Sequence, residues 1–536
     1  MIKKLKHIKI EYIYTCTILL AVFIINAWFL IAKGAAYIDS DMASNLQAGY
    51  IFNSERVLMS KNWFYSTVLA FMASENFYQL GFLLFPHNWI MARAAGVIIM
   101  LILQTVILFY FSRVMGESVC YSLLFAAFSM FPMSFWYMLM VTFGGYYTAN
   151  ILFSFLALLL IAIYANSEKK MVGIATLLLA TILGILLGMA GIKYLLFPYG
   201  PVCVAALFIV ITSISKNKTL LNNLKCSEWK LLISAIISTF FYMIGYGINM
   251  VFLAGKYHFE SHNDMCWGTM NAKAFVTGVA EFLSLFGYQE DEQANSLSPR
   301  RFAPKVFSIQ GIATAFGILI IAYLIFSTVR LLQRYTKLSL YEQLVVVLFL
   351  ATIAVDGIIF KWTQGFDTGA QYWVPAVPLG FLIMLIEVRT EDYAFDLTGK
   401  IVPVLITLCL FITSFSTINQ YEEQPLEACP ELVDVSDWLV NNGYTQGYAT
   451  FWQGNSLTAL SDGRLEMWVV TDFASLSTYQ WLQKTSHMNP PESNRLFAVI
   501  GRDEDKEEIM QSMSRVPGIP EIVYENEAGY AVVEYK

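Results

Sequence analysis

Two carboxylates, Asp39 and Asp41, follow shortly after the first long apolar segment of the chain, 12–32. Acidic side chains are costly to keep at the edge of a bilayer, so those found there usually serve a function. A carboxylate in this place could act as a general base and take a proton from a reacting group. The simpler alternative is that an aspartate caps the start of a helix, a position that Asp favours.

The composition is typical of a polytopic membrane protein. The 536 residues are 57% hydrophobic and 14% charged, with a mean hydropathy of +0.56, whereas soluble domains average about 25% charged residues. The net charge of −6 argues against a nucleic-acid partner. The first apolar segment has no small-residue cleavage site, so we expect a retained span and not a signal peptide. The seven cysteines lack the spacing of a zinc site, and a disulfide between Cys266 and Cys429 is one option.

Eleven apolar segments have about the length that a membrane span needs, roughly 20 residues. They are 12–32, 89–112, 118–140, 146–165, 171–191, 195–213, 231–254, 308–330, 342–360, 372–388 and 401–418. Alternate short loops are dense in Lys and Arg, which predicts that these loops and the N-terminus are cytoplasmic. An odd number of spans then places the C-terminus outside. We expect a multi-pass protein of a plasma membrane.

Three regions are expected on the outer side. The first loop, 33–88, has amphipathic stretches at 42–52 and 66–85 that predict helices on the membrane surface. The loop 255–307 has another at 272–286. The tail, 419–536, alternates apolar runs with helical patterns, which predicts a small α/β domain. The apolar runs are 447–451, 465–470, 496–500, 521–524 and 530–534, and the helical patterns are 430–441 and 504–514.

The predicted fold class is therefore a polytopic α-helical membrane domain, 1–418, followed by a soluble extracytoplasmic α/β domain, 419–536. This arrangement resembles the GT-C glycosyltransferases, which have a long first outer loop with acidic residues near its start. It is most similar to bacterial relatives of the protein O-mannosyltransferases and the lipid A aminoarabinose transferases. The sharp part of the resemblance is the first loop and the segment Gln371-Tyr-Trp-Val-Pro375, where Gln371 replaces an Arg often found in those enzymes.

The resemblance implies an inverting transfer of a sugar from a polyprenyl-phosphate donor to an envelope acceptor on the outer face. Asp39 or Asp41 would be the base, and the leaving phosphate needs cations. The candidate cations are Lys193, Lys361, Arg300 and Arg301. Each has a structural alternative, because lysines snorkel to the interface and arginines anchor loops to headgroups. Further substrate contacts are expected from Lys61, Glu75, Tyr146, Tyr147, His262, Asp264 and Tyr372.

A metal site and other functions are the alternatives to this hypothesis. His258, His262 and Asp264 could bind a metal, as could the pair Asp39 and Asp41, but we favour no cofactor. Asp356 could pair with Lys361, which would make both structural. A transporter or flippase of lipid-linked saccharides is the main alternative, although matching halves and charges deep within spans are not evident. A scaffold that presents the tail is another. No P-loop or GxGxxG motif indicates a nucleotide site.

Overall fold

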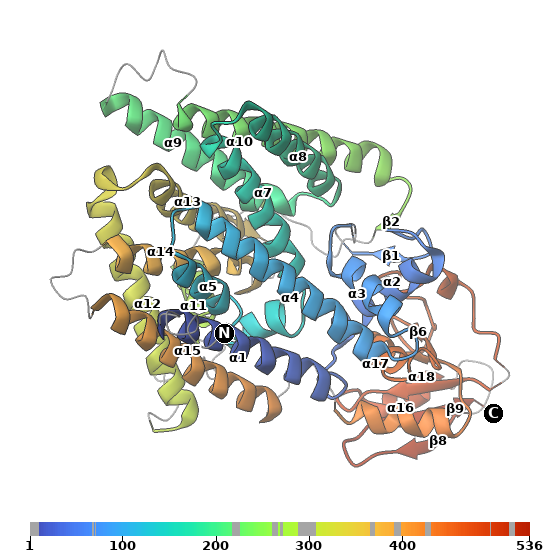
Figure 1. Ribbon diagram of the computed structural model, residues 1–536. Helices are drawn as coiled ribbons and strands as arrows, with labels where there is room; N and C mark the ends of the chain where they lie inside the picture. The colour runs from blue at the N-terminus through green and yellow to red at the C-terminus, as the bar shows by residue number, and fades with distance from the viewer. Residues whose placement is uncertain are drawn as a thin grey trace, which may run out of the picture. The chain divides into compact units, whose positions relative to one another are not determined.

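The computed structural model describes residues 10–535 except 67–68, 70, 217–225, 260–265, 268–271, 288–306, 365–369, 391–397, 424–429, 494 and 514–519. The chain divides into two compact units. A helical unit comprises Met1–Asn26, Met100–Asn249 and Asn263–Glu423. A loop–sheet unit comprises Ala27–Ile99, Met250–His262 and Gln424–Lys536. Two helices, α1 (Ile10–Ala32) and α4 (Trp89–Val114), contribute to both units (Figure 1).

Long apolar helices make up most of the helical unit. They are α7 (Thr148–Asn166), α8 (Lys170–Met189), α9 (Gly200–Lys216), α10 (Ser227–Ile248), α12 (Ile309–Gln333), α13 (Leu340–Trp362), α14 (Ala376–Thr390) and α15 (Thr398–Glu423). Shorter pieces are α5 (Val119–Phe128), α6 (Phe135–Tyr137), η2 (Met138–Thr142), η3 (Leu195–Tyr199), α11 (Ala272–Ser284), η7 (Tyr335–Lys337), η8 (Ala370–Trp373), β3 (Cys266–Trp267) and β4 (Thr363–Gln364). The π-turn η5 (Asn249–Leu253) ends α10. In the described ranges, nine helices are long and apolar enough to cross a membrane.

Small residues let the helices of this unit approach one another closely. Figure 1 shows α7, α8, α9 and α10 side by side, and their residues are in contact. A side chain on Gly188 of α8 would lie 2.1 Å from the backbone oxygen of Tyr242 on α10. A side chain on Gly245 of α10 would lie 2.1 Å from the backbone oxygen of Ile185 on α8. Glycines at such a helix contact are typical of membrane bundles.

The predicted multi-pass helical fold with a small C-terminal sheet is confirmed, but the count of eleven spans is not. The segment 118–140, predicted as one span, is divided between α5, α6 and η2. Pro132 lies between α5 and α6, where its missing N–H and its ring oppose a continuous helix. The segment 372–388 begins in η8 and continues as α14, which has 15 residues.

The loop–sheet unit joins the first long loop to the C-terminal part of the chain. From the loop come α2 (Ser40–Glu55), β1 (Phe64–Tyr65) and α3 (Ser74–Leu84). A middle segment adds β2 (His258–Phe259), which pairs parallel with β1. The C-terminal part contains α16 (Leu432–Asn441), β5 (Gln446–Ala449), α17 (Phe451–Leu460), β6 (Glu466–Val469), η9 (Thr485–Met488), β7 (Phe497–Ile500), α18 (Lys506–Met513), β8 (Pro520–Glu525) and β9 (Ala531–Tyr535).

The five-stranded sheet has the order β6-β5-β7-β9-β8, with β6, β5 and β7 parallel and β7, β9 and β8 antiparallel. Successive side chains of a strand point to opposite faces of the sheet. The strands therefore contribute side chains to two hydrophobic cores, one on each face. On one face, Ala449 and Met467 pack with residues of α16 and α17. On the other, Tyr448 and Trp468 pack with Met513 of α18. The prediction of a small α/β domain is confirmed.

Candidate active site

The start of α2 holds both aspartates singled out by the sequence. Asp39 is the N-cap of this helix, and its Oδ1 accepts a hydrogen bond of 2.7 Å from the backbone N–H of Met42. Its side chain is only 2% exposed. The capping role that was the simpler alternative for an aspartate here therefore applies to Asp39.

Asp41 has a different environment from Asp39. It lies in the first turn of α2 and is half-buried, whereas Asp39 is almost wholly buried. The exposed N–H groups at a helix start favour a negative charge within the first turn. Of the two aspartates, Asp41 is therefore the less buried, which makes it the better placed to meet a substrate as a general base.

The N-terminal half of α2 is fixed by α17 of the C-terminal part. Ser40 Oγ donates a hydrogen bond of 2.6 Å to the backbone oxygen of Phe451. Two turns later, Gln47 Nε2 donates to the backbone oxygen of Asn455 at 3.1 Å and to its side-chain oxygen at 3.0 Å. Residues seven apart lie on the same face of a helix. One face of α2 is thus occupied by α17, and Asp41 lies on a neighbouring face.

Backbone hydrogen bonds also join the first loop to the C-terminal part. The N–H of Phe64 donates to the oxygen of Gln483 at 2.9 Å, and the N–H of Leu482 donates to the oxygen of Phe64 at 3.0 Å. The N–H of Thr485 donates to the oxygen of Asn62 at 3.1 Å. These bonds form a short antiparallel pairing between segments more than 400 residues apart in the sequence.

A buried arginine lies near the two aspartates, and the sequence reasoning missed it. Arg93 of α4 is 1% exposed, and its Nη2 lies 2.8 Å from the sulfur of Met42. It also bonds to the hydroxyl of Tyr78 on α3, and Asp39 lies within electrostatic range of that hydroxyl. Burial raises the pKa of Tyr78 to about 12, although the Arg93 charge opposes the shift. The available signal was a charged residue inside an apolar segment.

Glu75 and Lys61 occupy different places in the loop–sheet unit. Glu75 is half-buried in the first turn of α3 and acts on the same Tyr78 hydroxyl as Arg93. Lys61 is exposed in the loop before β1. The helices α2 and α3 meet at Gly49, where a side chain would lie 2.8 Å from Tyr78 Cβ. Glu75 is therefore close to the buried polar cluster, and Lys61 is on the surface.

Lys193 lies in the break between α8 and α9 of the helical unit. It is half-buried, and its Nζ is 5.4 Å from the ring centroid of Tyr194. The chain leaves helical geometry here, with φ of 125° at Gly191, and the oxygen of Gly191 accepts a bond of 2.7 Å from the Tyr242 hydroxyl. A side-chain donor thus satisfies a backbone group that the broken helix exposes, as a membrane segment requires.

Three tyrosines predicted to contact substrate also belong to the helical unit. Tyr146 and Tyr147 are half-buried just before α7, after a turn in which Gly145 has φ of 81°. Tyr372 is half-buried in η8. Tyr372 and Asp356 both lie within electrostatic range of the Tyr147 hydroxyl. The structure therefore brings Tyr147 and Tyr372 together around a buried acid of α13.

Several predicted residues cannot be placed. His262, Asp264, Arg300, Arg301 and Cys429 lie outside the described residues. Lys361 falls within α13, but its side chain is not described, so its predicted pairing with Asp356 stays a prediction. Across the described ranges, Asp356 Oδ2 has no hydrogen-bond partner, and no group of three His, Cys, Asp or Glu residues is arranged to hold a metal.

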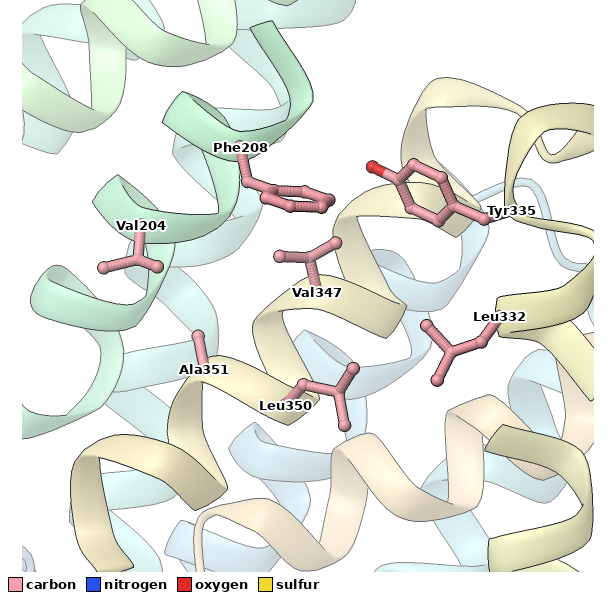
Figure 2. A pocket seen from close by; sticks show the side chains of 7 residues that line it. All are labelled: Val204, Phe208, Leu332, Tyr335, Val347, Leu350 and Ala351. Atoms are coloured by element: carbon pink, nitrogen blue, oxygen red, sulfur yellow. The ribbon is translucent and has the colours of Figure 1, made fainter. Parts of the chain in front are cut away.

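A cavity of about 490 Å³ in the helical unit lies between α9, the end of α12, η7 and α13. Figure 2 shows the rings of Phe208 and Tyr335 opposite each other in the lining of the cavity, with Val347 between them. The two ring centroids are 5.9 Å apart. The other lining residues are Val204, Leu332, Leu350 and Ala351. This lining is almost wholly apolar, so the cavity is not suited to hold a sugar or a phosphate.

Comparison with solved structures identifies the fold. Over 98% of this chain and 97% of the other, the structure aligns with ArnT from Cupriavidus metallidurans bound to undecaprenyl phosphate, at a TM-score of 0.56 and 10% identity. The chain has the fold of ArnT. The apo state of ArnT aligns at a TM-score of 0.55 and 10% identity, over 96% of this chain and 97% of that chain.

The likeness to ArnT includes the helical unit and the C-terminal sheet, because it extends over nearly the whole of both chains. It confirms the fold that the predicted resemblance implied, a multi-pass helical part followed by a small C-terminal sheet. An oligosaccharyltransferase from Archaeoglobus fulgidus aligns at a TM-score of only 0.45 and 12% identity, over 85% of this chain and 64% of that chain. No family model and no curated protein matches the sequence.

Proposed function

We propose that this chain is a membrane glycosyltransferase that moves a sugar from a polyprenyl-phosphate donor to an acceptor on the outer face of the membrane. The observation that carries the proposal is the ArnT fold over nearly the whole chain, together with a half-buried aspartate, Asp41, in the first turn of the first helix after α1. That ArnT was solved with undecaprenyl phosphate supports a lipid-linked donor of this kind.

In the proposed reaction, Asp41 is the base. It takes the proton from the acceptor hydroxyl as that oxygen attacks the anomeric carbon and the polyprenyl phosphate leaves, which inverts the configuration. Asp39 is less suited, because it is buried and already accepts the Met42 N–H as a helix cap. Its role is to fix the start of α2 and so to position Asp41. Ser40, which bonds to the Phe451 oxygen, fixes the same turn from the other side.

The leaving phosphate needs positive charge more than it needs a proton donor. Lys193 is our first candidate for this role, because it is half-buried in a break between two spanning helices where backbone groups are already satisfied. Lys361, Arg300 and Arg301 remain candidates from the sequence. We assign sugar or acceptor contacts to Tyr147 and Tyr372, which share the surroundings of Asp356.

The remaining parts of the proposal concern contacts, metal and location. Lys61, Glu75, Tyr146, His262 and Asp264 stay candidates for contacts with the substrates. Because the proposed leaving group is already a phosphate, no strong general acid is needed; we favour protein cations over a metal for its charge. We propose a plasma-membrane location with a cytoplasmic N-terminus and an extracytoplasmic C-terminal part, which would put Asp41 on the side of the acceptor.

The decisive experiment measures release of undecaprenyl phosphate and labelled glycan product. The full chain in nanodiscs is given undecaprenyl-phosphate sugars, one sugar at a time, with an envelope extract as acceptor. We expect Asp41→Asn to lower turnover by about 10² to 10⁴, the usual contribution of a general base. The matched control is Asp434→Asn, because Asp434 is an exposed aspartate in the first turn of α16 and should be dispensable.

Two outcomes would contradict the proposal. One is full turnover by a correctly folded Asp41→Asn variant. That result would show that Asp41 is not the base. The other, measured with the chain reconstituted in sealed vesicles, is movement of the lipid-linked saccharide across the bilayer with no glycosyl product from any sugar tested. That result would favour a flippase, the alternative that the sequence left open.

A further inference from the structure

Four aromatic rings gather on the C-terminal part, on the side of the sheet where β6 is the edge strand. We call Phe451, Trp452, Tyr479 and Trp481 the aromatic platform. The centroid of Phe451 is 5.4 Å from that of Trp452 and 4.8 Å from that of Trp481. The centroids of Tyr479 and Trp481 are 5.7 Å apart. Trp452 is 50% exposed, Tyr479 and Trp481 are half-buried, and Phe451 is buried beneath them, so the exposed part of the platform is centred on the Trp452 ring.

The platform is held rigidly although it is not part of either core of the sheet. Phe451 and Trp452 are the first two residues of α17. The N–H of Tyr479 donates to the oxygen of Val469 on β6 at 2.9 Å. Asn455 Nδ2 of α17 donates to the oxygen of Leu482 at 3.2 Å, which ties the segment bearing Trp481 to the same helix. The two cores consist of other residues.

The platform adjoins the turn that bears the proposed base. The backbone oxygen of Phe451 accepts the 2.6 Å hydrogen bond from Ser40, and Asp41 is the next residue. Ser40 Oγ also lies 3.4 Å from Ser456 Oγ of α17. The half-exposed ring of Trp452 and the half-buried carboxylate of Asp41 therefore belong to two helix starts that are in direct contact.

We propose that the aromatic platform stacks against a pyranose ring of the acceptor, so that the acceptor of this enzyme is a saccharide. This inference rests on the proposed function and extends it to the acceptor class. A pyranose has an apolar face of C–H groups that suits an exposed indole, while its hydroxyls stay hydrated or bond to polar neighbours. The donor sugar is tethered to lipid through its phosphate, whereas Trp452 belongs to a polar, water-facing part of the chain.

The structure around the platform favours a saccharide over a peptide. A peptide commonly binds by adding a strand to a free sheet edge, but the edge strand β6 is already covered at Val469. Gln483 accepts the N–H of Val469 at 3.1 Å and donates to its oxygen at 2.9 Å. The exposed loop beside Tyr479 instead presents Asp472 and Ser475, linked by a hydrogen bond of 2.7 Å, as groups that could bond to sugar hydroxyls.

Saturation-transfer NMR on the full chain in nanodiscs tests the proposal without requiring turnover. The probes are methyl β-D-glucopyranoside, methyl α-D-mannopyranoside and a tetramer of N-acetylglucosamine, with a neutral hexapeptide as the competing class. We expect saturation of the C–H protons on one face of at least one sugar. The signal should fall at least fivefold in Trp452→Ala, persist in part in Trp452→Phe, and be unchanged in Asp41→Asn.

The matched control is Met488→Ala, because Met488 is 51% exposed on the same part of the chain and lies outside the platform. It should keep the full signal. In a transfer assay, Trp452→Ala should raise the acceptor KM roughly tenfold, about 1.4 kcal/mol, and leave the donor KM unchanged. Sugar signal that survives in Trp452→Ala, or signal from the peptide and none from any sugar, overturns the inference.

The two proposals fail in distinguishable ways. If the chain transfers sugar but Trp452→Ala has a normal acceptor KM, the platform has no role in acceptor binding and the glycosyltransferase stands. In the alternative outcome, the sugars give a Trp452-dependent saturation-transfer signal with wild type and with Asp41→Asn while no donor yields product. That result would support sugar binding by the platform and contradict the proposed glycosyltransferase activity.

Discussion

At the scale of single residues, the two aspartates of the first loop differ in what surrounds them. Asp39 is buried and bonded to the helix that it caps, and Asp41 is half-buried. The sequence could single out the pair, because acids beside an apolar span are unusual, but the division of roles depends on the turn of α2 at which each one lies. Asn and Asp cap a helix about equally well, whereas Ala does not.

This difference predicts distinct outcomes for two substitutions of Asp39. Asp39→Asn should keep the cap, the thermal stability and most of the activity. Asp39→Ala should lower the free energy of unfolding by about 1 kcal/mol, the usual cost of a lost cap. Thermal unfolding in detergent and turnover on the same samples check both. A stable but inactive Asp39→Asn would move the role of the base from Asp41 to Asp39.

The environment of Arg93 could not be predicted from the apolar segment that contains it. A buried guanidinium requires hydrogen bonds and negative partners, and Tyr78 and the nearby Asp39 supply this environment. The partners come from α2 and α3, so neither the spacing nor the composition of α4 could identify them. Only the fold brings the three residues together.

At the scale of elements, hydropathy and alternation predicted most of the pieces. The five apolar runs of the tail correspond to β5–β9, and its two helical patterns correspond to α16 and α18. The helix α17 was missed, since Phe451–Leu460 mixes aromatic, polar and small residues without a clear apolar stripe. The pairing of 62–65 with 482–485 could not be predicted either, because a contact between distant segments produces no periodic pattern in the sequence.

The joint between α2 and α17 can be measured with a double-mutant cycle. Gln47→Ala and Asn455→Ala should each destabilise the chain by roughly 1 kcal/mol, and the double variant should lose less than the sum, because both remove the hydrogen bond between the two side chains. The free energies of unfolding are obtained from thermal unfolding of the full chain, with limited proteolysis of the loop–sheet unit as the readout. As a control, Gln47→Ala with Asn526→Ala should be additive, since Asn526 lies in the turn between β8 and β9.

A second joint, in the helical unit, gives a prediction for pH. Glu117, between α4 and α5, pairs with Arg389 at 3.1 Å, and Arg389 also bonds to Glu342. Burial raises the pKa of Glu117 from 4.5 to about 7, although Arg389 and Arg113 oppose the shift and Glu342 adds to it. The folded state therefore holds a proton that the unfolded state has lost between these two values, and stability should fall by about 1.4 kcal/mol per pH unit across this window.

Glu117→Gln tests this interpretation, because glutamine cannot ionise. We expect the variant to be more stable than wild type at pH 8 and to differ little from it at pH 4.5, as judged by thermal unfolding in detergent. Glu168→Gln, an exposed glutamate between α7 and α8, should leave the pH profile unchanged. A Glu117→Gln variant that is less stable at pH 8 would show that the ion pair with Arg389 outweighs the cost of burial.

At the scale of the whole molecule, the composition predicted a polytopic membrane protein, and the nine long apolar helices of the described ranges support this prediction. Orientation was predicted from positive charge in short loops, a statistical rule that acts during insertion. The number of spans was harder to predict. Mean hydropathy stays high around Pro132, although α5 ends before this residue. The proposed chemistry requires a particular orientation, since Asp41 must meet its acceptor outside the cell.

Two single-cysteine substitutions test the orientation against the unsubstituted chain. The side chain of Asp503 in the C-terminal part is 89% exposed, and Glu168 is exposed in a loop predicted to be cytoplasmic. On intact cells, a membrane-impermeant thiol reagent should label Asp503→Cys and not Glu168→Cys, and lysis should make both reactive. Labelling of Glu168→Cys alone would invert the predicted topology. Asp41 belongs to the same unit as Asp503, so that result would put the proposed base on the cytoplasmic side.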